Sequence, residues 1–158
     1  MAGQLGIFGF SGYSASKFAL RGLAEALQME LKPHGVRVTL AFPPDTDTPG
    51  FAAENISKPR ETSIICAAGG LLKPEQVASC LLADIRAGRF FSYLGMDGWL
   101  LTNVTCGMAP ADSLVEFLGQ LFCMGACRFV AWCYHLWMNR IVLHCAANKD
   151  PSRSDKDR

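Results

Sequence analysis

The chain has 158 residues, of which 50% are hydrophobic and 18% are charged, and its 15 basic and 14 acidic residues leave a net charge of +1. The high apolar content and the low net charge exclude a disordered tail. The missing basic excess excludes a nucleic-acid binder driven by bulk electrostatics. The length allows about one domain, and the hydrophobic share directs attention to membrane-associated stretches.

The first twelve residues are typical of a loop, because glycine recurs at positions 3, 6, 9 and 12 with apolar residues between them. They do not resemble a signal peptide, since they lack a basic start and a long apolar core. A domain rarely begins in such a loop. We therefore expect the parent sequence to extend upstream of this chain.

A long helix is predicted over 14–32, a stretch rich in alanine and leucine that Pro33 and Gly35 bring to an end. Its apolar residues recur at helical spacing, at Phe18, Leu23, Ala26, Leu27 and Leu31. The β-branched stretch over 36–41 predicts a strand, which the following two prolines end. The polar, proline-punctuated stretch over 45–62 predicts a loop, with a short helix near 51–55 as an option.

Pro74 opens a second predicted helix, which runs to Ala87 and is capped by Gly88. A strand is predicted over 89–94 and a turn over 96–98. The order helix, strand, loop, helix, strand is the alternation of a parallel α/β sheet. Because such a sheet needs more than two strands and has both faces covered, this pattern also predicts a missing first half.

The character of the chain changes at Trp99. The stretch over 99–111 carries no charge, and the stretch over 117–138 carries only Arg128 and His135 as basic groups. The second stretch has aromatic residues near one end, as in an interfacial belt, at Trp132, Tyr134 and Trp137. We interpret 98–147 as a membrane-associated helical hairpin or re-entrant segment, and 148–158 as a disordered charged tail. The alternative is a hydrophobic helix pair buried against the α/β part or a partner chain.

The seven cysteines are odd in number and form no Cys-x-x-Cys pair, which argues against a disulfide framework. Thiols kept reduced in the cytosol or in a membrane fit this pattern. A metal site is conceivable where thiols and imidazoles gather, at Cys123, Cys127, Cys133, His135 and His144. Small apolar fillers in a packed or lipid-facing helix are the favoured interpretation, so no metal is predicted. Cys145 is likewise interpreted as an unmodified buried thiol rather than an acylation site.

Tyr13 and Lys17 carry the main chemical signal, because residues four apart lie on one face of a helix. An ammonium beside a phenol stabilises the phenolate, so the pair can exchange a proton with a carbonyl or an alcohol. The three donors of a lysine ammonium can also bind ribose hydroxyls. Alone, the spacing is weak evidence, since most such pairs are a surface lysine beside a half-buried tyrosine.

The context of this pair resembles the short-chain dehydrogenase/reductase family. That family places Tyr-x-x-x-Lys on one helix and Pro-Gly-x-x-x-Thr after the next strand, and the second motif stands here at 43–48 with Pro44 where glycine is usual. A closer resemblance, over residues 2 to about 145, is to the branch that reduces 3-ketosphinganine, carried by the runs 9–19, 21–30, 43–51, 73–78 and 105–110. The implied fold is α/β, with 1–97 as the C-terminal half of a Rossmann-like doubly wound parallel sheet.

The resemblance also implies roles and partners. Tyr13 would protonate the 3-keto oxygen, and Lys17 would assist it and hold the nicotinamide ribose. The nicotinamide itself would be lined by Pro43, Pro44, Thr46 and Thr48. The implied cofactor is NADPH, the implied substrate is a long-chain keto-sphingoid base, and the implied location is the endoplasmic reticulum membrane with the site facing the cytosol.

The family's glycine-rich dinucleotide fingerprint and its carbonyl-polarising serine would both lie upstream of this chain. We therefore expect the chain alone to show little or no reductase activity, since the phosphate-binding loop supplies much of the cofactor affinity. The alternative is a non-catalytic, membrane-tethered interaction module, which would pair with a full-length reductase or with another copy of itself.

Overall fold

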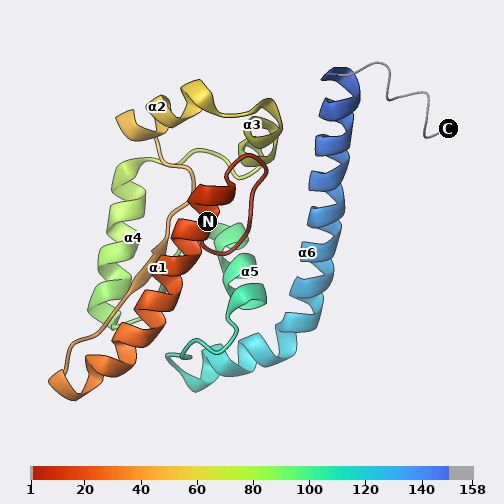
Figure 1. The fold of residues 1–158 in the computed structure, drawn as a ribbon. Helices are drawn as coiled ribbons and strands as arrows, with labels where there is room; N and C mark the ends of the chain where they lie inside the picture. The colour runs from red at the N-terminus through yellow and green to blue at the C-terminus, as the bar shows by residue number, and fades with distance from the viewer. Residues whose placement is uncertain (1, 150–158) are drawn as a thin grey trace.

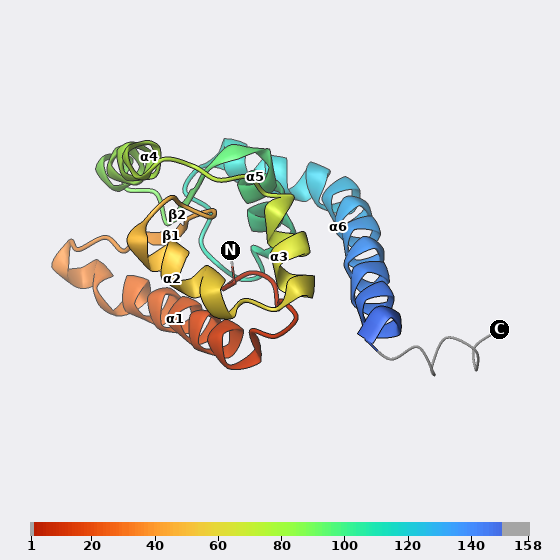
Figure 2. The same cartoon turned by 90° about the horizontal axis from the view of Figure 1, so that it is seen from above.

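The computed structural model describes residues 2–149 and places a two-stranded parallel sheet between helices (Figure 1). The elements in chain order are α1 (Ser11–Glu30), the 3-10 turn η1 (Lys32–His34), β1 (Leu40–Phe42), α2 (Pro49–Ser57), α3 (Arg60–Ala67), α4 (Pro74–Ala87), β2 (Phe91–Tyr93), α5 (Gly95–Thr105) and α6 (Leu114–Lys149). In Figure 2, α1 and α4 cover opposite faces of the sheet. The α/β class and the parallel pairing predicted from the sequence are confirmed.

The core forms where α1 and the two strands meet. Strand β1 pairs with β2 in the register Leu40 to Phe91. Aromatic rings tilted against each other fill the space, with ring centroids 5.7 Å apart for Phe42 and Phe91 and 4.9 Å apart for Phe90 and Phe91. Ala24 brings α1 against this cluster, because its small side chain lets the helix approach closely. The core therefore anchors the helix that carries Tyr13 and Lys17.

The prediction for α4 is confirmed at both ends, since Pro74 is its first residue and Gly88 takes the left-handed conformation, with φ of 72°, as its C-cap. The first strand is shorter than predicted. It spans Leu40–Phe42 because its partner β2 has only three residues. Ahead of it, the Thr39 hydroxyl donates a hydrogen bond to the Arg89 carbonyl at 2.8 Å.

The loop predicted over 45–62 is helical for most of its length, since α2 and α3 occupy it; the short helix offered as an option near 51–55 is confirmed as part of α2. The prolines there mark helix starts: Pro49 is the first residue of α2 and Pro59 is the N-cap of α3. The Thr48 hydroxyl caps α2 by accepting a hydrogen bond from the Phe51 N–H at 3.1 Å. The turn predicted over 96–98 is also wrong, since those residues form the first turns of α5.

The hydrophobic C-terminal part is helical, but it is not a hairpin of two matched arms. Helix α5 has 11 residues, which is about 16 Å at 1.5 Å per residue. Its residues Thr102 and Asn103 are buried, so one side of this helix packs inside the domain. The other helix, α6, is long and apolar enough to cross a membrane over Leu114–Asn148, and only 6% of the apolar 18-residue stretch within it is buried. The boundary expected at 97/98 falls inside α5, and most of the tail expected at 148–158 lies outside the described residues.

Two polar contacts tie the connection between α5 and α6 to the α/β part. The Asp112 carboxylate accepts a hydrogen bond from the Phe90 N–H at 2.7 Å. The Cys106 carbonyl, just after α5, accepts one from the Arg21 guanidinium of α1 at 2.8 Å. Helix α6 then runs along one side of the domain, where it contacts α3 and α5 (Figures 1 and 2).

All seven cysteines are free thiols. Over residues 2–149, no group of three or more His, Cys, Asp or Glu side chains is arranged to hold a metal ion. Cys145 is only 4% exposed, on the face of α6 that is turned away from solvent. The cysteines of α6 therefore offer no metal-binding constellation within the described part of the chain.

Candidate active site

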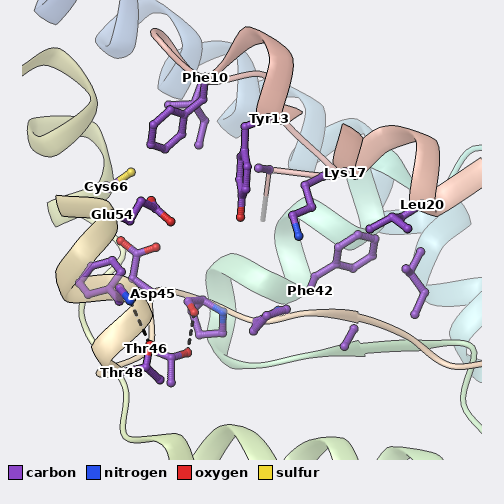
Figure 3. Close-up of a pocket in the computed structure, with 18 residues that line it drawn as sticks. Phe10, Tyr13, Lys17, Leu20, Phe42, Asp45, Thr46, Thr48, Glu54 and Cys66 are labelled. Carbon is purple, nitrogen blue, oxygen red and sulfur yellow. Dashed lines mark hydrogen bonds between the residues drawn. The ribbon is translucent and has the colours of Figure 1, made fainter. Parts of the chain in front are cut away.

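Helix α1 places Tyr13 and Lys17 side by side within its first two turns. The Lys17 ammonium lies 5.1 Å from the centroid of the Tyr13 ring. Phe10, just before the helix, packs against the same ring at a centroid distance of 5.5 Å. Figure 3 shows the Tyr13 and Lys17 side chains pointing from α1 toward the loop that follows β1. The phenol and the ammonium thus share one space.

The loop over 43–48 forms the opposite wall of this space, and the backbone holds it firmly. The Asp45 carbonyl accepts a hydrogen bond from the Leu72 N–H, and the Asp47 N–H donates one to the Leu72 carbonyl, each at 2.9 Å. Within the loop, the Thr46 hydroxyl donates to the Pro44 carbonyl at 2.8 Å. The loop is therefore fixed by the segment that precedes α4.

The two threonines keep unused hydrogen-bonding capacity, because a hydroxyl has one donor and two acceptor positions. Thr46 uses its donor on Pro44 and can still accept. Thr48 uses an acceptor position on the Phe51 N–H and can still donate. The wall opposite Tyr13 thus offers both an acceptor and a donor, the pair that a carboxamide group requires.

A cavity of about 320 Å³ lies between α1 and this loop. All six residues named from the sequence line it, namely Tyr13, Lys17, Pro43, Pro44, Thr46 and Thr48. The structure adds lining residues that sequence reasoning missed, among them Ile7, Phe10, Asp45, Phe51, Glu54 and Cys66. Asp45 stands inside the motif over 43–48, so its position was the available signal, whereas Glu54 lies on the optional helix near 51–55, whose place relative to the Tyr13 pair the sequence did not indicate.

The carboxyl groups of Asp45 and Glu54 give this cavity an acidic side (Figure 3). Burial raises the pKa of the Asp45 carboxyl, an effect that Lys58 opposes and Glu54 strengthens. Lys58 itself pairs with Glu54 at 3.4 Å. Burial and the nearby Asp45 charge likewise raise the pKa of the Cys66 thiol. The cavity therefore favours the uncharged forms of the Asp45 carboxyl and the Cys66 thiol.

We expect Asp45→Asn to raise the melting temperature modestly at neutral pH. The folded-state pKa of Asp45 is raised from its ordinary value of 3.8, so the folded protein holds that proton more tightly than the unfolded chain. As pH rises above 3.8 the wild type loses stability by deprotonation, whereas asparagine does not. Melting curves of both proteins between acid and neutral pH test this prediction. It would be contradicted if the difference in melting temperature between the variant and the wild type did not become smaller toward acid pH.

Comparison with known proteins connects this geometry to a family. The family model described as short chain dehydrogenase matches residues 1–59, which include α1, β1 and the loop over 43–48. The chain is 54% identical over 148 residues to the 3-ketodihydrosphingosine reductase of Bos taurus and 53% identical over 148 residues to that of Mus musculus. Each match covers 94% of this chain and 45% of the relative. No solved structure matches.

A fish relative gives the same result. The 3-dehydrosphinganine reductase of Danio rerio is 50% identical over 153 residues, which are 97% of this chain and 46% of the relative. The chain thus spans a little under half the length of these curated relatives. The matched region contains the Tyr13–Lys17 pair, the loop after β1 and the cavity between them. On this evidence, the chain belongs to the short-chain dehydrogenase/reductase family.

Proposed function

We propose that this chain carries the proton-transfer part of an NADPH-dependent reductase that converts 3-ketosphinganine to sphinganine. The observation that carries the proposal is the convergence of Tyr13, Lys17 and the loop over 43–48 on one cavity. The relatives that are 50–54% identical to this chain over the matched region are named as reductases of this ketone. The cofactor choice rests on the family resemblance.

Tyr13 would act as the general acid, with its hydroxyl donating a proton to the ketone oxygen. A reduced nicotinamide, when bound, supplies the hydride to the ketone carbon. With one proton and one hydride added, the C=O group becomes a secondary alcohol and Tyr13 is left as phenolate. Lys17, 5.1 Å from the ring centroid, stabilises that phenolate by its positive charge.

The residues present fit the nicotinamide end of such a cofactor. Thr46 retains an acceptor and Thr48 a donor, which match the NH₂ and C=O of a carboxamide. Pro43 and Pro44 present apolar surface on the same wall of the cavity. Lys17 carries donors suited to ribose hydroxyls. This chain would therefore hold the reacting ring and its ribose.

Helix α6 supports a membrane location. It is long and apolar enough to cross a bilayer, and most of its large apolar side chains face outward. A long-chain ketone partitions into membranes, so a reductase that meets it there needs such an anchor. We place the protein at the endoplasmic reticulum membrane, with the Tyr13 cavity on the cytosolic side.

The test is reduction of 3-ketosphinganine with NADPH, and with NADH for comparison, in microsomes that lack the endogenous reductase. Two proteins are compared: this chain, and a chimera that joins it to the part of the Bos taurus relative outside the match. We expect turnover by the chimera and little or none by the chain alone. A chimera that stays inactive while the intact relative works in the same membranes would contradict the proposal.

A second candidate is an interaction module that pairs with a full-length reductase or another copy. The observation in its favour is that α1 carries large apolar side chains that are 44–63% exposed, on more than one side of the helix, at Phe18, Leu20, Leu23 and Met29. Exposed apolar faces of this kind mark contact surfaces. Co-purification of the tagged chain with a full-length reductase, lost in a Leu23→Glu and Met29→Glu variant, would support this function.

A further inference from the structure

A second cavity, of about 440 Å³, lies beside the first one, between the N-terminal segment, α3, α5 and α6. Its lining is mainly apolar and draws on all four parts of the chain, with Leu5, Ile65, Leu101, Val104, Ala131 and Met138 as representative side chains. Cavities of this size and polarity are typical of small-molecule binding sites. The mechanism proposed above makes no use of this cavity.

The two cavities adjoin each other. Four residues line both of them, namely Ile7, Pro44, Asp45 and Cys66. A molecule whose reacting group lies at Tyr13 would pass these shared side chains, Asp45 among them, to reach the apolar space. The shape required is a polar head of a few atoms joined to a long apolar tail.

Helix α6 supplies the outer wall of the apolar cavity. Met138 is 5% exposed and closes the wall on the inside, whereas Val130 and Trp132 are 47% and 54% exposed and form its outer edge. These two residues lie within the stretch that is apolar enough to cross a bilayer. The two adjoining cavities together thus lie between Tyr13 and the surface of the helix that would meet lipid.

The side-chain amide of Gln4, which lines the second cavity, has an unused hydrogen-bond acceptor that a ligand could satisfy. Gln4 is 5% exposed, and its amide nitrogen donates to the Thr102 hydroxyl at 2.9 Å. Its buried oxygen has no hydrogen-bond partner among the described residues, although buried polar atoms are normally satisfied. Gln4 adjoins Gly3, which lines the Tyr13 cavity. A hydroxyl or ammonium near the head of the ligand would supply the missing donor.

We propose that this second cavity binds the alkyl chain of the long-chain keto base while its ketone lies at Tyr13. The assignment rests on the proposed function, which gives the ligand a ketone, an amine and a hydroxyl at one end of a long hydrocarbon. It makes the walls over α5 and α6 the determinants of chain length. A phospholipid acyl chain has the same hydrocarbon chemistry, so the test must separate the two sources.

The experiment is photo-crosslinking of the full chain in phosphatidylcholine nanodiscs, with a C18 3-ketosphinganine analogue that carries a diazirine at the end of its alkyl chain. Mass spectrometry is expected to place the label on cavity residues of α5 and α6, such as Leu101, Val104 and Ala131. An excess of unlabelled 3-ketosphinganine should remove the label, whereas added phosphatidylcholine should not. Labelling confined to the outward face of α6, or equal competition by phosphatidylcholine, would overturn the proposal.

Variants sharpen this test. Leu101→Trp overfills the cavity and is expected to lower specific labelling about tenfold, the effect of a steric penalty of 1–2 kcal/mol. Leu121→Trp is the matched control, since Leu121 is 59% exposed on α6 and lies outside the cavity. Val104→Phe repeats the test if Leu101→Trp fails to fold, as judged by circular dichroism. Labelling that none of the folded cavity variants reduces would also overturn the proposal.

The proposed function fails in a different way. If the C18 probe labels the cavity and is competed as expected, but the chimera reduces no ketone, then the alkyl-chain site stands and the reductase assignment falls. If the chimera reduces 3-ketosphinganine while labelling stays outside the cavity, then the reductase stands and the alkyl-chain site falls.

Discussion

Replacing Tyr13 by phenylalanine is expected to lower the reduction of 3-ketosphinganine by about 100- to 10,000-fold, the range that one positioned general acid contributes. The substitution removes only the hydroxyl, so the ring keeps its packing against Phe10 at 5.5 Å. The Lys17 ammonium remains beside the ring, but the phenol hydroxyl assigned to protonate the ketone is gone. The initial rate of the chimera in microsomes, with NADPH saturating, gives the measurement.

Tyr93→Phe is the matched control, because it makes the same chemical change in β2, away from the Tyr13 cavity. We expect its rate to stay close to that of the parent chimera. A Tyr13→Phe protein that keeps more than about a tenth of the parent rate would contradict the assignment of Tyr13 as the acid.

Truncation of Phe91 to alanine is expected to cost about 3–5 kcal/mol of folding free energy, the usual effect of emptying a buried aromatic site. Phe91 is 3% exposed and contacts the rings of both Phe42 and Phe90. The Arg21 guanidinium also lies over it, 5.6 Å from the ring centroid. The substitution therefore weakens three things together: the packing around the strand pair, the packing of α1 against the strands, and the cation–π contact with Arg21.

Urea unfolding of the detergent-solubilised chain, followed by circular dichroism, measures this loss. Phe122→Ala serves as the control, since Phe122 is 78% exposed on α6 and its truncation should change the free energy of unfolding by less than about 0.5 kcal/mol. Equal losses in the two variants would mean that the Phe91 cluster is not the core of the chain.

The sequence predicted those elements whose boundaries depend on local chemistry. Helix α4 has proline at its first position and glycine at its C-cap, and both ends were located correctly. The parallel α/β class followed from the order of elements. The convergence of the six candidate residues on one cavity was also foreseeable, because Tyr13 and Lys17 sit on one helix face and the loop over 43–48 follows the adjacent strand.

The remaining features depend on contacts between distant segments. A short helix near 51–55 was offered as an option and lies within α2, but α3 was not predicted, because a proline at position 59 fits a loop as well as a helix start. The length of β1 is set by the three residues of β2, about 50 positions later. Glu54 lines the cavity because of where α2 packs, which the helix pattern alone does not reveal.

The hydrogen bond from the Phe90 N–H to Asp112, with the bond from Arg21 to the Cys106 carbonyl, has a mechanical consequence. Both bonds hold the connection between α5 and α6 against the α/β part. We therefore expect the long helix and the sheet to rotate as one rigid body. A bilayer whose thickness tilts α6 would tilt the Tyr13 cavity by the same angle. Under the proposed function, the lipid composition of the membrane would then set the orientation of the Tyr13 cavity relative to the bilayer surface from which a sphingoid base enters it.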